Sequence, residues 1–324
     1  MKRAFNAIAV LTTLVSLFCA RAFAEPYPSR PVRVMVPSSA GGVTDLVARI
    51  TGNYLSARTN QRFIVENRTG AGGNLATDAV AKSEPDGYTL GIVASGNIVI
   101  NPYIFEKMPF DAKTDLAFIA STAQAPQVIA INKDVPAKTL QELIAYAKAY
   151  PDSLRYASAG AGSTMHLAGD QFARLAGLKL IHVPYRGAAP AVSDVIAGVV
   201  QMISVSAGPI MGFVRSGQLR VLAAASSHRL KHFPDVPTSS EAGLPGYEMT
   251  TWFGMIAPRN TPDPIVQTLH SLAQDMLTDS TSMKRLEDSF LDRMPSTQPE
   301  FAAFVAAEFP RWEKVVRDSG LQPD

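Results

Sequence analysis

Residues 32–49 read VRVMVPSSAGGVTDLVAR, and this stretch predicts a strand, a loop and a helix in direct succession. The β-branched run at its start is typical of a buried strand, and the apolar residues after Thr44 recur at helical spacing. Gly41 and Gly42 allow the loop to bend sharply and to approach a ligand closely, because neither has a Cβ. Thr44 or Asp45 is placed to cap the helix.

This loop has the groups that an anion requires. It offers backbone N–H groups, the hydroxyls of Ser38 and Ser39, and the positive end of a helix dipole, which together suit a carboxylate or another small anion. The same residues are equally compatible with an ordinary turn between a strand and a helix. The rest of the chain has to distinguish the two interpretations.

Two further strand–loop units follow in the first third of the chain. Residues 63–66 form the next predicted strand, and a glycine-rich bend connects it to a helix that ends near Ala81. A third predicted strand, 89–93, leads to the small polar residues Ser95 and Asn97. Alternating strands and helices predict a parallel sheet, whose carboxyl edge is the usual position of a ligand. We therefore expect these loops to converge on one edge of the sheet.

The same layout recurs in the second half of the chain. The predicted strand 154–157 leads through a glycine-rich loop into a helix that begins near Met165. Ser163 and Thr164 supply hydroxyls at the start of this helix, where an anion would bind. His166 lies just inside the helix, and it either lines the cleft or packs against the loop.

Arg186 follows the next predicted strand, 180–183, in another loop at the same edge. It is a fixed cation, and its guanidinium can meet a carboxylate with two parallel hydrogen bonds. The alternative is a surface arginine on a turn.

Two extended segments, 118–132 and 247–257, lack helical periodicity and predict two chain crossings between two domains. We therefore expect an α/β protein with two doubly wound domains joined by two extended hinge crossovers. Residues 25–125 with 249–324 form the first expected domain, and residues 126–248 form the second.

Residues 1–24 have the pattern of a signal peptide for export, with a basic start, an apolar centre and Ala22-Phe23-Ala24 as the cleavage site. We expect cleavage after Ala24 and a location in the periplasm. Cys19 is the only cysteine of the 324 residues and lies in this signal. Disulfides, thiol catalysis and cysteine–metal sites are therefore excluded for the mature chain.

The signal also accounts for the basic character of the full sequence. Without Lys2, Arg3 and Arg21, the count of Lys and Arg falls from 30 to 27 against 28 Asp and Glu, so the net charge changes from +2 to −1. This balance gives no support to nucleic-acid binding.

No motif predicts a cofactor, a metal or catalysis. Gly160-Ala161-Gly162 lacks the third glycine of a dinucleotide-binding fingerprint. His228 and His232 are spaced for one helical face, but Arg229 and Lys231 surround them with positive charge, which favours a solvated loop or helix end over a zinc site. The Gly-x-Ser-x-Gly elbow of many hydrolases does not occur. We expect a protein without cofactor, metal or enzymatic activity.

Several further motifs, taken in order, resemble one protein family from about Tyr27 to the end of the chain. They are Pro37 to Asp45, Glu66-Asn67-Arg68 with Gly70 to Gly73, Pro85 to Tyr88, Asn101-Pro102, Gly162-Ser163 with His166-Leu167, Val183 to Gly187, Asp235 to Thr238, Gly243 to Tyr247, and Trp252-Phe253-Gly254. This set is similar to the solute receptors of tripartite tricarboxylate transporters, also called Bug receptors.

The resemblance implies a Venus-flytrap receptor of the periplasmic binding protein type, which closes on a small carboxylate and delivers it to the membrane subunits of a transporter. In this family, the first strand–helix loop and loops of the second domain hold the carboxylate, largely through backbone amides and ordered water. The matching positions are Ser38, Ser39, Gly41, Gly42 and Thr44 in one domain and Gly162, Ser163, Thr164, Arg186, Gly187 and Ala188 in the other. Ser95, Asn97 and His166 complete the predicted ligand site.

Two departures from the family pattern concern the far end of the ligand. Residues 38–40 are Ser-Ser-Ala where the family often has an aromatic residue, any residue and Pro, and an acid that is common after Gly198 is absent. Because the cleft loops contain few acids, we expect a di- or tricarboxylate or an aromatic acid rather than an amino acid. The alternatives are a secreted α/β enzyme that acts on a carboxylic acid or ester, and a receptor that signals through a sensor kinase. We expect a monomer that binds no nucleic acid.

Overall fold

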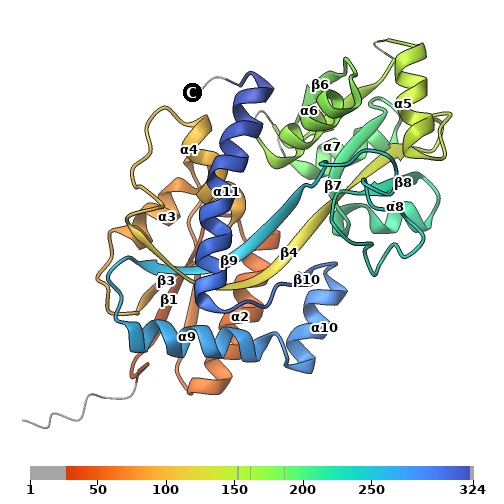
Figure 1. Cartoon of the computed structure of the whole chain (residues 1–324). Helices are drawn as coiled ribbons and strands as arrows, with labels where there is room; N and C mark the ends of the chain where they lie inside the picture. The colour runs from red at the N-terminus through yellow and green to blue at the C-terminus, as the bar shows by residue number, and fades with distance from the viewer. Residues whose placement is uncertain (1–26, 152, 161, 186, 322–324) are drawn as a thin grey trace, which may run out of the picture.

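The computed structural model describes residues 27–321, except residues 152, 161 and 186, and shows two α/β lobes joined by two long strands (Figure 1). The expected signal peptide lies outside the described residues. The long strands are β4 (Leu116–Asn132) and β9 (Thr250–Pro258), which pair with each other in antiparallel orientation. They are the two extended crossings that the sequence predicts.

The first lobe is built from the beginning and the end of the chain. Its elements are β1 (Val32–Val36), α2 (Val43–Thr59), β2 (Phe63–Asn67), the 3-10 turn η1 (Ala71–Gly73), α3 (Asn74–Ala81), β3 (Thr89–Ala94), the π-helical turn η2 (Gly96–Ile100), α4 (Asn101–Ile104), α9 (Asp263–Met276), α10 (Ser280–Asp288), β10 (Asp292–Arg293) and α11 (Gln298–Ser319).

The second lobe is formed by the middle of the chain, between β4 and β9. Its elements are α5 (Leu140–Ala149), β5 (Arg155–Ser158), α6 (Thr164–Ala176), β6 (Ile181–Pro184), α7 (Ala188–Ile196), β7 (Met202–Ser206), the 3-10 turn η3 (Gly208–Ile210), α8 (Met211–Arg215) and β8 (Leu219–Ala224).

The strands of both lobes join in one ten-stranded sheet. Its order is β2-β1-β3-β9-β4-β7-β5-β6, and β8 and β10 each pair with β4 off this path. Within the lobes, β1 is parallel to β2 and β3, and β5 is parallel to β6 and β7. The crossing strands are antiparallel to their neighbours, since β9 runs against β3 and β4 runs against β7. The parallel sheet predicted from the alternating strands and helices is therefore present within the lobes, and the crossings, whose direction the sequence does not predict, are antiparallel to their neighbours.

Strand β4 belongs to both halves of the sheet. Residues 116–126 pair with β9, and residues 127–131 pair with β7. Pro126, which has no backbone N–H to donate, lies at the point where the pairing partner changes. The middle of β4 is therefore the place where the two lobes meet.

Buried side chains alternate along the strands and build a core on each face of the first-lobe sheet. Val34 packs with α2 and α9 on one face, and its neighbour Met35 packs with α3 and α11 on the other. This alternation follows from the two-residue repeat of a strand. Helix α11 also covers β9, because the ring of Phe301 meets that of Trp252 edge to face at 5.6 Å.

Several short elements of the structure are not predicted from the sequence, among them α4, η3, α8 and β10. The sequence does not predict α10, because only Ser282 and Leu286 of its residues are buried and the apolar repeat is too sparse to recognise. It also does not predict η2, the turn that directly follows β3. Within the described part of the chain, no helix combines the length and the apolar character that a membrane span requires.

Candidate functional site

A cavity of about 220 Å³ lies between the two lobes. Its lining comes from both lobes and from both crossing strands, and consists of Val43, Thr44, Ala94, Ala125, Gln127, Thr164, Met165, Ala188, Val205, Ser206, Pro209, Thr251 and Phe253. This volume is below the roughly 300–1,000 Å³ of sites that hold drug-sized molecules. The cavity therefore suits a small metabolite.

The floor of the cavity is formed by four neighbouring strands, β3, β9, β4 and β7. The cross-strand pairs in it are Ala94 with Phe253, Ala125 with Thr251, and Gln127 with Ser206. Side chains of paired residues point to the same face of a sheet, so these six share one side of it. The two alanines leave space that larger side chains would fill.

The walls of the cavity are helix N-termini from both lobes. Helix α2 contributes Val43 and Thr44, α6 contributes Thr164 and Met165, and α7 contributes Ala188. The first N–H groups of a helix have no acceptor inside it, and those of Val43 and Thr44 have no other acceptor among the described residues. The N-terminal end of a helix carries a partial positive charge, so walls of this kind from both lobes favour an anion in the same cavity.

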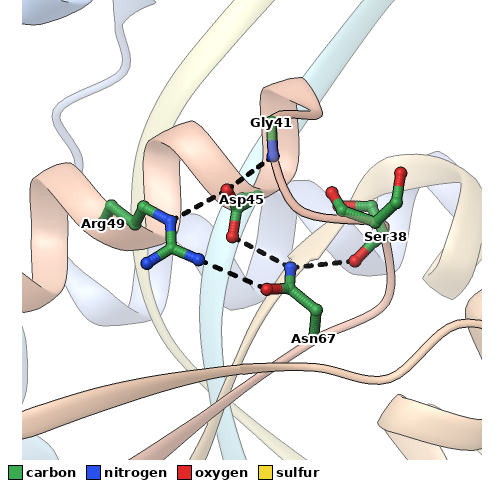
Figure 2. A network of polar contacts seen from close by, with 6 residues as sticks. Ser38, Gly41, Asp45, Arg49 and Asn67 are labelled. Atoms are coloured by element: carbon green, nitrogen blue, oxygen red, sulfur yellow. Dashed lines mark hydrogen bonds and ion pairs between the residues drawn. The ribbon is translucent and has the colours of Figure 1, made fainter.

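Asp45 fixes the loop in front of α2 (Figure 2). Its buried carboxylate accepts hydrogen bonds at 2.9 Å each from the backbone N–H of Gly41, Nε of Arg49 and Nδ2 of Asn67. Asn67 also donates to the carbonyl oxygen of Ser38 at 2.9 Å. Burial alone would raise the pKa of Asp45, but the three hydrogen bonds outweigh burial and hold this pKa below its usual range. The carboxylate therefore stays ionised, and its hydrogen bonds hold the loop in place.

The expectation that Thr44 or Asp45 caps α2 is wrong. Gly42 is the N-cap residue, and no side chain caps this helix. The N–H of Gly41 is bonded to Asp45, and the N–H of Gly42 is bonded to the carbonyl oxygen of Ser39 at 3.2 Å. The first N–H groups of this loop without an acceptor among the described residues are therefore those of Val43 and Thr44, which follow the two glycines.

The loop in front of α6 is held by its own side chains. Ser163 caps the helix, because its Oγ accepts from the N–H of His166 at 3.2 Å and donates to the carbonyl oxygen of Gly160 at 2.7 Å. Nδ1 of His166 accepts from the N–H of Gly162 at 3.2 Å. Burial lowers the pKa of His166, and burial with repulsion from His166 lowers the pKa of His182, which stacks on it, to about 4. Both rings are neutral near pH 7.

Three of the predicted ligand residues, Thr44, Thr164 and Ala188, line the cavity. The others in the described part of the chain lie outside its lining, namely Ser38, Ser39, Gly41, Gly42, Ser95, Asn97, Gly162, Ser163, His166 and Gly187. Most of these belong to the loops and helix turns that present the three lining residues. Arg186 lies outside the described residues.

Asn97 holds the end of β3 beside the floor, and Ser95 lies next to this end in the sequence. Asn97 accepts the N–H of Ala94 at 3.1 Å and donates to the carbonyl oxygen of Gly72 at 2.7 Å, so both ends of its amide are bonded within the lobe. Ser95 is fully buried, and its hydroxyl has no hydrogen-bond partner among the described residues.

Sequence reasoning missed the floor of the cavity, which includes Gln127, Thr251 and Phe253. These residues lie within strands, whereas the sequence predicts ligand contacts in the loops at strand ends. One available signal was a polar Gln127 within the apolar run of residues 125–131. It is 3 % exposed, and a buried polar side chain in a strand requires a partner.

The lining contains hydroxyls, one amide and apolar groups, which are groups that hold a ligand. Among the residues that the structure describes, no group of three or more His, Cys, Asp or Glu side chains is placed to bind a metal ion. His228 and His232 lie in the connection between β8 and β9, in a loop as the sequence favours.

Comparison with known proteins gives a consistent picture. The family described as "Tripartite tricarboxylate transporter family receptor" matches residues 47–321. The structure of R. palustris Rpa4515 with adipate is 33% identical, with a TM-score of 0.82, and the match covers 92% of this chain and 100% of that one. MatC from Rhodopseudomonas palustris with bound malate is also 33% identical, with a TM-score of 0.77 and coverage of 90% and 100%. The periplasmic binding protein BugD is 30% identical, with a TM-score of 0.78 and coverage of 92% and 100%.

Proposed function

Because the chain belongs to the receptor family of the tripartite tricarboxylate transporters, we propose that it binds a small carboxylate and delivers it to the membrane subunits of such a transporter. One observation carries the proposal: the N-termini of α2, α6 and α7, from both lobes, surround the same cavity of about 220 Å³. The adipate and malate in the two R. palustris relatives support a dicarboxylate as the ligand.

The first helical turns form the proposed carboxylate seat. Thr44 and Thr164 each offer a hydroxyl to the cavity, and Val43, Thr44 and Ala188 offer backbone N–H groups beside it. Arg186 precedes Ala188 by two residues, and we propose that its guanidinium approaches the same carboxylate. Ser163 and Gly41 hold these groups in position through their own hydrogen bonds.

Binding is proposed to act through closure of the two lobes. A ligand that contacts both walls stabilises the closed state more than the open one, and only this difference in affinity shifts the population. We propose residues 25–125 with 249–324 as one moving body and 126–248 as the other. The change of pairing partner at Pro126 of β4 supports this division.

Export is proposed from the signal pattern of residues 1–24, with cleavage after Ala24 and a periplasmic, monomeric product. The periplasmic relative BugD supports this location. The described lining has no carboxylate, imidazole or amine that could act as a general acid or base, so we propose a binding protein without turnover.

Thermal unfolding of the mature protein with adipate, malate, citrate and benzoate tests the function. A ligand that binds only the folded state at 100 times its Kd adds about 2.7 kcal/mol to the free energy of unfolding, so the melting temperature should rise for one class of carboxylate. Melting temperatures that stay constant with every acid up to millimolar concentration would refute the proposal.

The cavity itself is tested by filling it. Ala94→Leu places a larger side chain on the floor beside Phe253 and should abolish the ligand-induced rise. Ala307→Leu makes the same change at an exposed position of α11 and should leave binding intact. Binding by Ala94→Leu at wild-type affinity would place the ligand elsewhere.

A further inference from the structure

The backbone of Gln127 is held by hydrogen bonds at the junction of the two lobes. Its backbone N–H donates to the carbonyl oxygen of Met249 at 2.8 Å, and its carbonyl oxygen accepts from the N–H of Ala225 at 2.8 Å. It pairs with Ser206 across β4 and β7, and its side chain reaches the floor of the cavity while only 3 % of the residue is exposed. The side chain is thus presented to the cavity by backbone that is bonded on both sides.

A buried relay determines which end of the Gln127 amide faces the cavity. Ser204 Oγ donates to Gln127 Oε1 at 2.9 Å, and Ser204 Oγ lies 3.0 Å from the hydroxyl of Tyr247. Ser204 has only one proton and gives it to Gln127, so the hydroxyl of Tyr247 must be the donor to Ser204. Ser204 and Tyr247 are both fully buried, and burial raises the pKa of Tyr247, which keeps the hydroxyl protonated.

The relay occupies the amide oxygen of Gln127 and leaves its NH₂ group as a donor. Nε2 has no acceptor among the described residues, although Gln127 lines the cavity. This NH₂ group opens onto the cavity, so it is suited to an acceptor that arrives with a ligand. The lining residues include no carboxylate that could serve instead.

The floor donor is set apart from the helix N-termini. In the sheet order, β1, which leads into α2, is three strands away from β4, and β5, which leads into α6, is two strands away. Gln127 thus lies on the floor of the cavity, whereas the helix N-termini form its walls, so a ligand whose carboxylate lies at the walls meets Gln127 with a different group.

We propose that Gln127 determines specificity, because its Nε2 donates a hydrogen bond to a second oxygen-bearing group of the ligand. This inference rests on the proposed carboxylate-binding function. It predicts selection of acids with a second acceptor, such as dicarboxylates, over unsubstituted monocarboxylates of the same length. Ser204 and Tyr247 are positioning residues, which act by orienting the Gln127 amide.

The test compares adipate with hexanoate, and succinate with butyrate, by calorimetry on the mature protein. The wild type should prefer the diacid of each pair. Gln127→Met keeps the length of the side chain but removes the donor, so it should weaken diacid binding by about tenfold or more and leave the affinity for the monoacid within about twofold. Gln267→Met, on the exposed face of α9, should change neither affinity.

The positioning residues supply a second readout if Gln127→Met does not fold. Ser204→Ala and Tyr247→Phe keep the donor but free it to rotate, so each should reduce the preference for the diacid by a smaller factor. Equal weakening of both acids in these variants would overturn the inference, because a residue that only packs does not distinguish them. A wild type that binds none of the four acids, nor malate or citrate, would instead refute the carboxylate function itself.

Discussion

The imidazole rings of His166 and His182 stack at 3.9 Å between centroids, with 13° between their planes, directly below the loop in front of α6. Two imidazolium rings cannot occupy this arrangement comfortably, because like charges at such a distance repel each other. His166 also needs its neutral form to accept the N–H of Gly162. The loop at one wall of the cavity is therefore built on a pair of neutral histidines.

We predict that the protein loses stability between about pH 6.5 and pH 4. Burial lowers the pKa of His166, and burial with repulsion lowers the pKa of His182 to about 4, whereas both titrate near pH 6.5 when unfolded. The unfolded chain therefore binds more protons in this window, and the free energy of unfolding falls by an amount on the order of 1 kcal/mol, given the partial exposure of His182. Urea unfolding at pH 7 and pH 4.5 measures it. His182→Gln should flatten this dependence, and an unaltered pH profile would contradict it.

Asp45→Ala should destabilise the protein by about 2 kcal/mol, because it removes the acceptor of three hydrogen bonds at a carboxylate that is 3 % exposed. It should also weaken ligand binding through the loosened loop at α2. Asp288→Ala is the matched control, since Asp288 pairs with Lys284 at the surface and should contribute less than about 0.5 kcal/mol. Equal losses in the two variants, measured by urea unfolding, would show that the Asp45 network has no special role.

Ser163→Ala should cost about 1 kcal/mol as the loss of a helix cap, and it should also lower ligand affinity, because the same hydroxyl holds the loop at the cavity wall. Thr139→Ala removes the corresponding cap of α5, away from the cavity, and should cost a similar amount of stability with no change in affinity. Calorimetry and urea unfolding on both variants separate the two effects. Unchanged affinity in Ser163→Ala would exclude a binding role for this loop.

Gly254→Ala should destabilise the protein by about 1–3 kcal/mol, because a Cβ on this residue of β9 would run into the ring of Phe301 on α11. Gly212→Ala, in α8, meets no atom within 4 Å and should instead be neutral or stabilising by up to about 1 kcal/mol. Differential scanning calorimetry gives the comparison. A neutral Gly254→Ala would mean that α11 moves away from the sheet without cost.

Most of the fold follows from local patterns. The strand and helix around Gly41 and Gly42, the long extended segments and the helix that begins near Met165 are all predicted from periodicity and turns, since these signals are contained in a few consecutive residues. The antiparallel crossings are not, because the direction of β9 beside β3 depends on residues about 160 positions apart in the chain.

The lining of the candidate site is likewise predictable from the sequence only in part. Thr44, Thr164 and Ala188 could be predicted because helix N-termini after strands are recognisable from sequence. The floor could not, because which face of β4 lines the cavity is determined by its register with β9 and β7. The sequence predicts Ser163 as a ligand donor, but the carbonyl oxygen of Gly160 accepts its hydroxyl proton, and the sequence alone does not reveal short-range bonds of this kind.

Because β4 supplies backbone partners to both β9 and β7, the two lobes are not separable modules. A fragment that contained only one lobe would carry half of β4 as a bare edge, with its N–H and C=O groups open to any other strand. Such pieces would aggregate rather than fold. A substitution in the middle of β4 therefore affects the folding of both lobes at once.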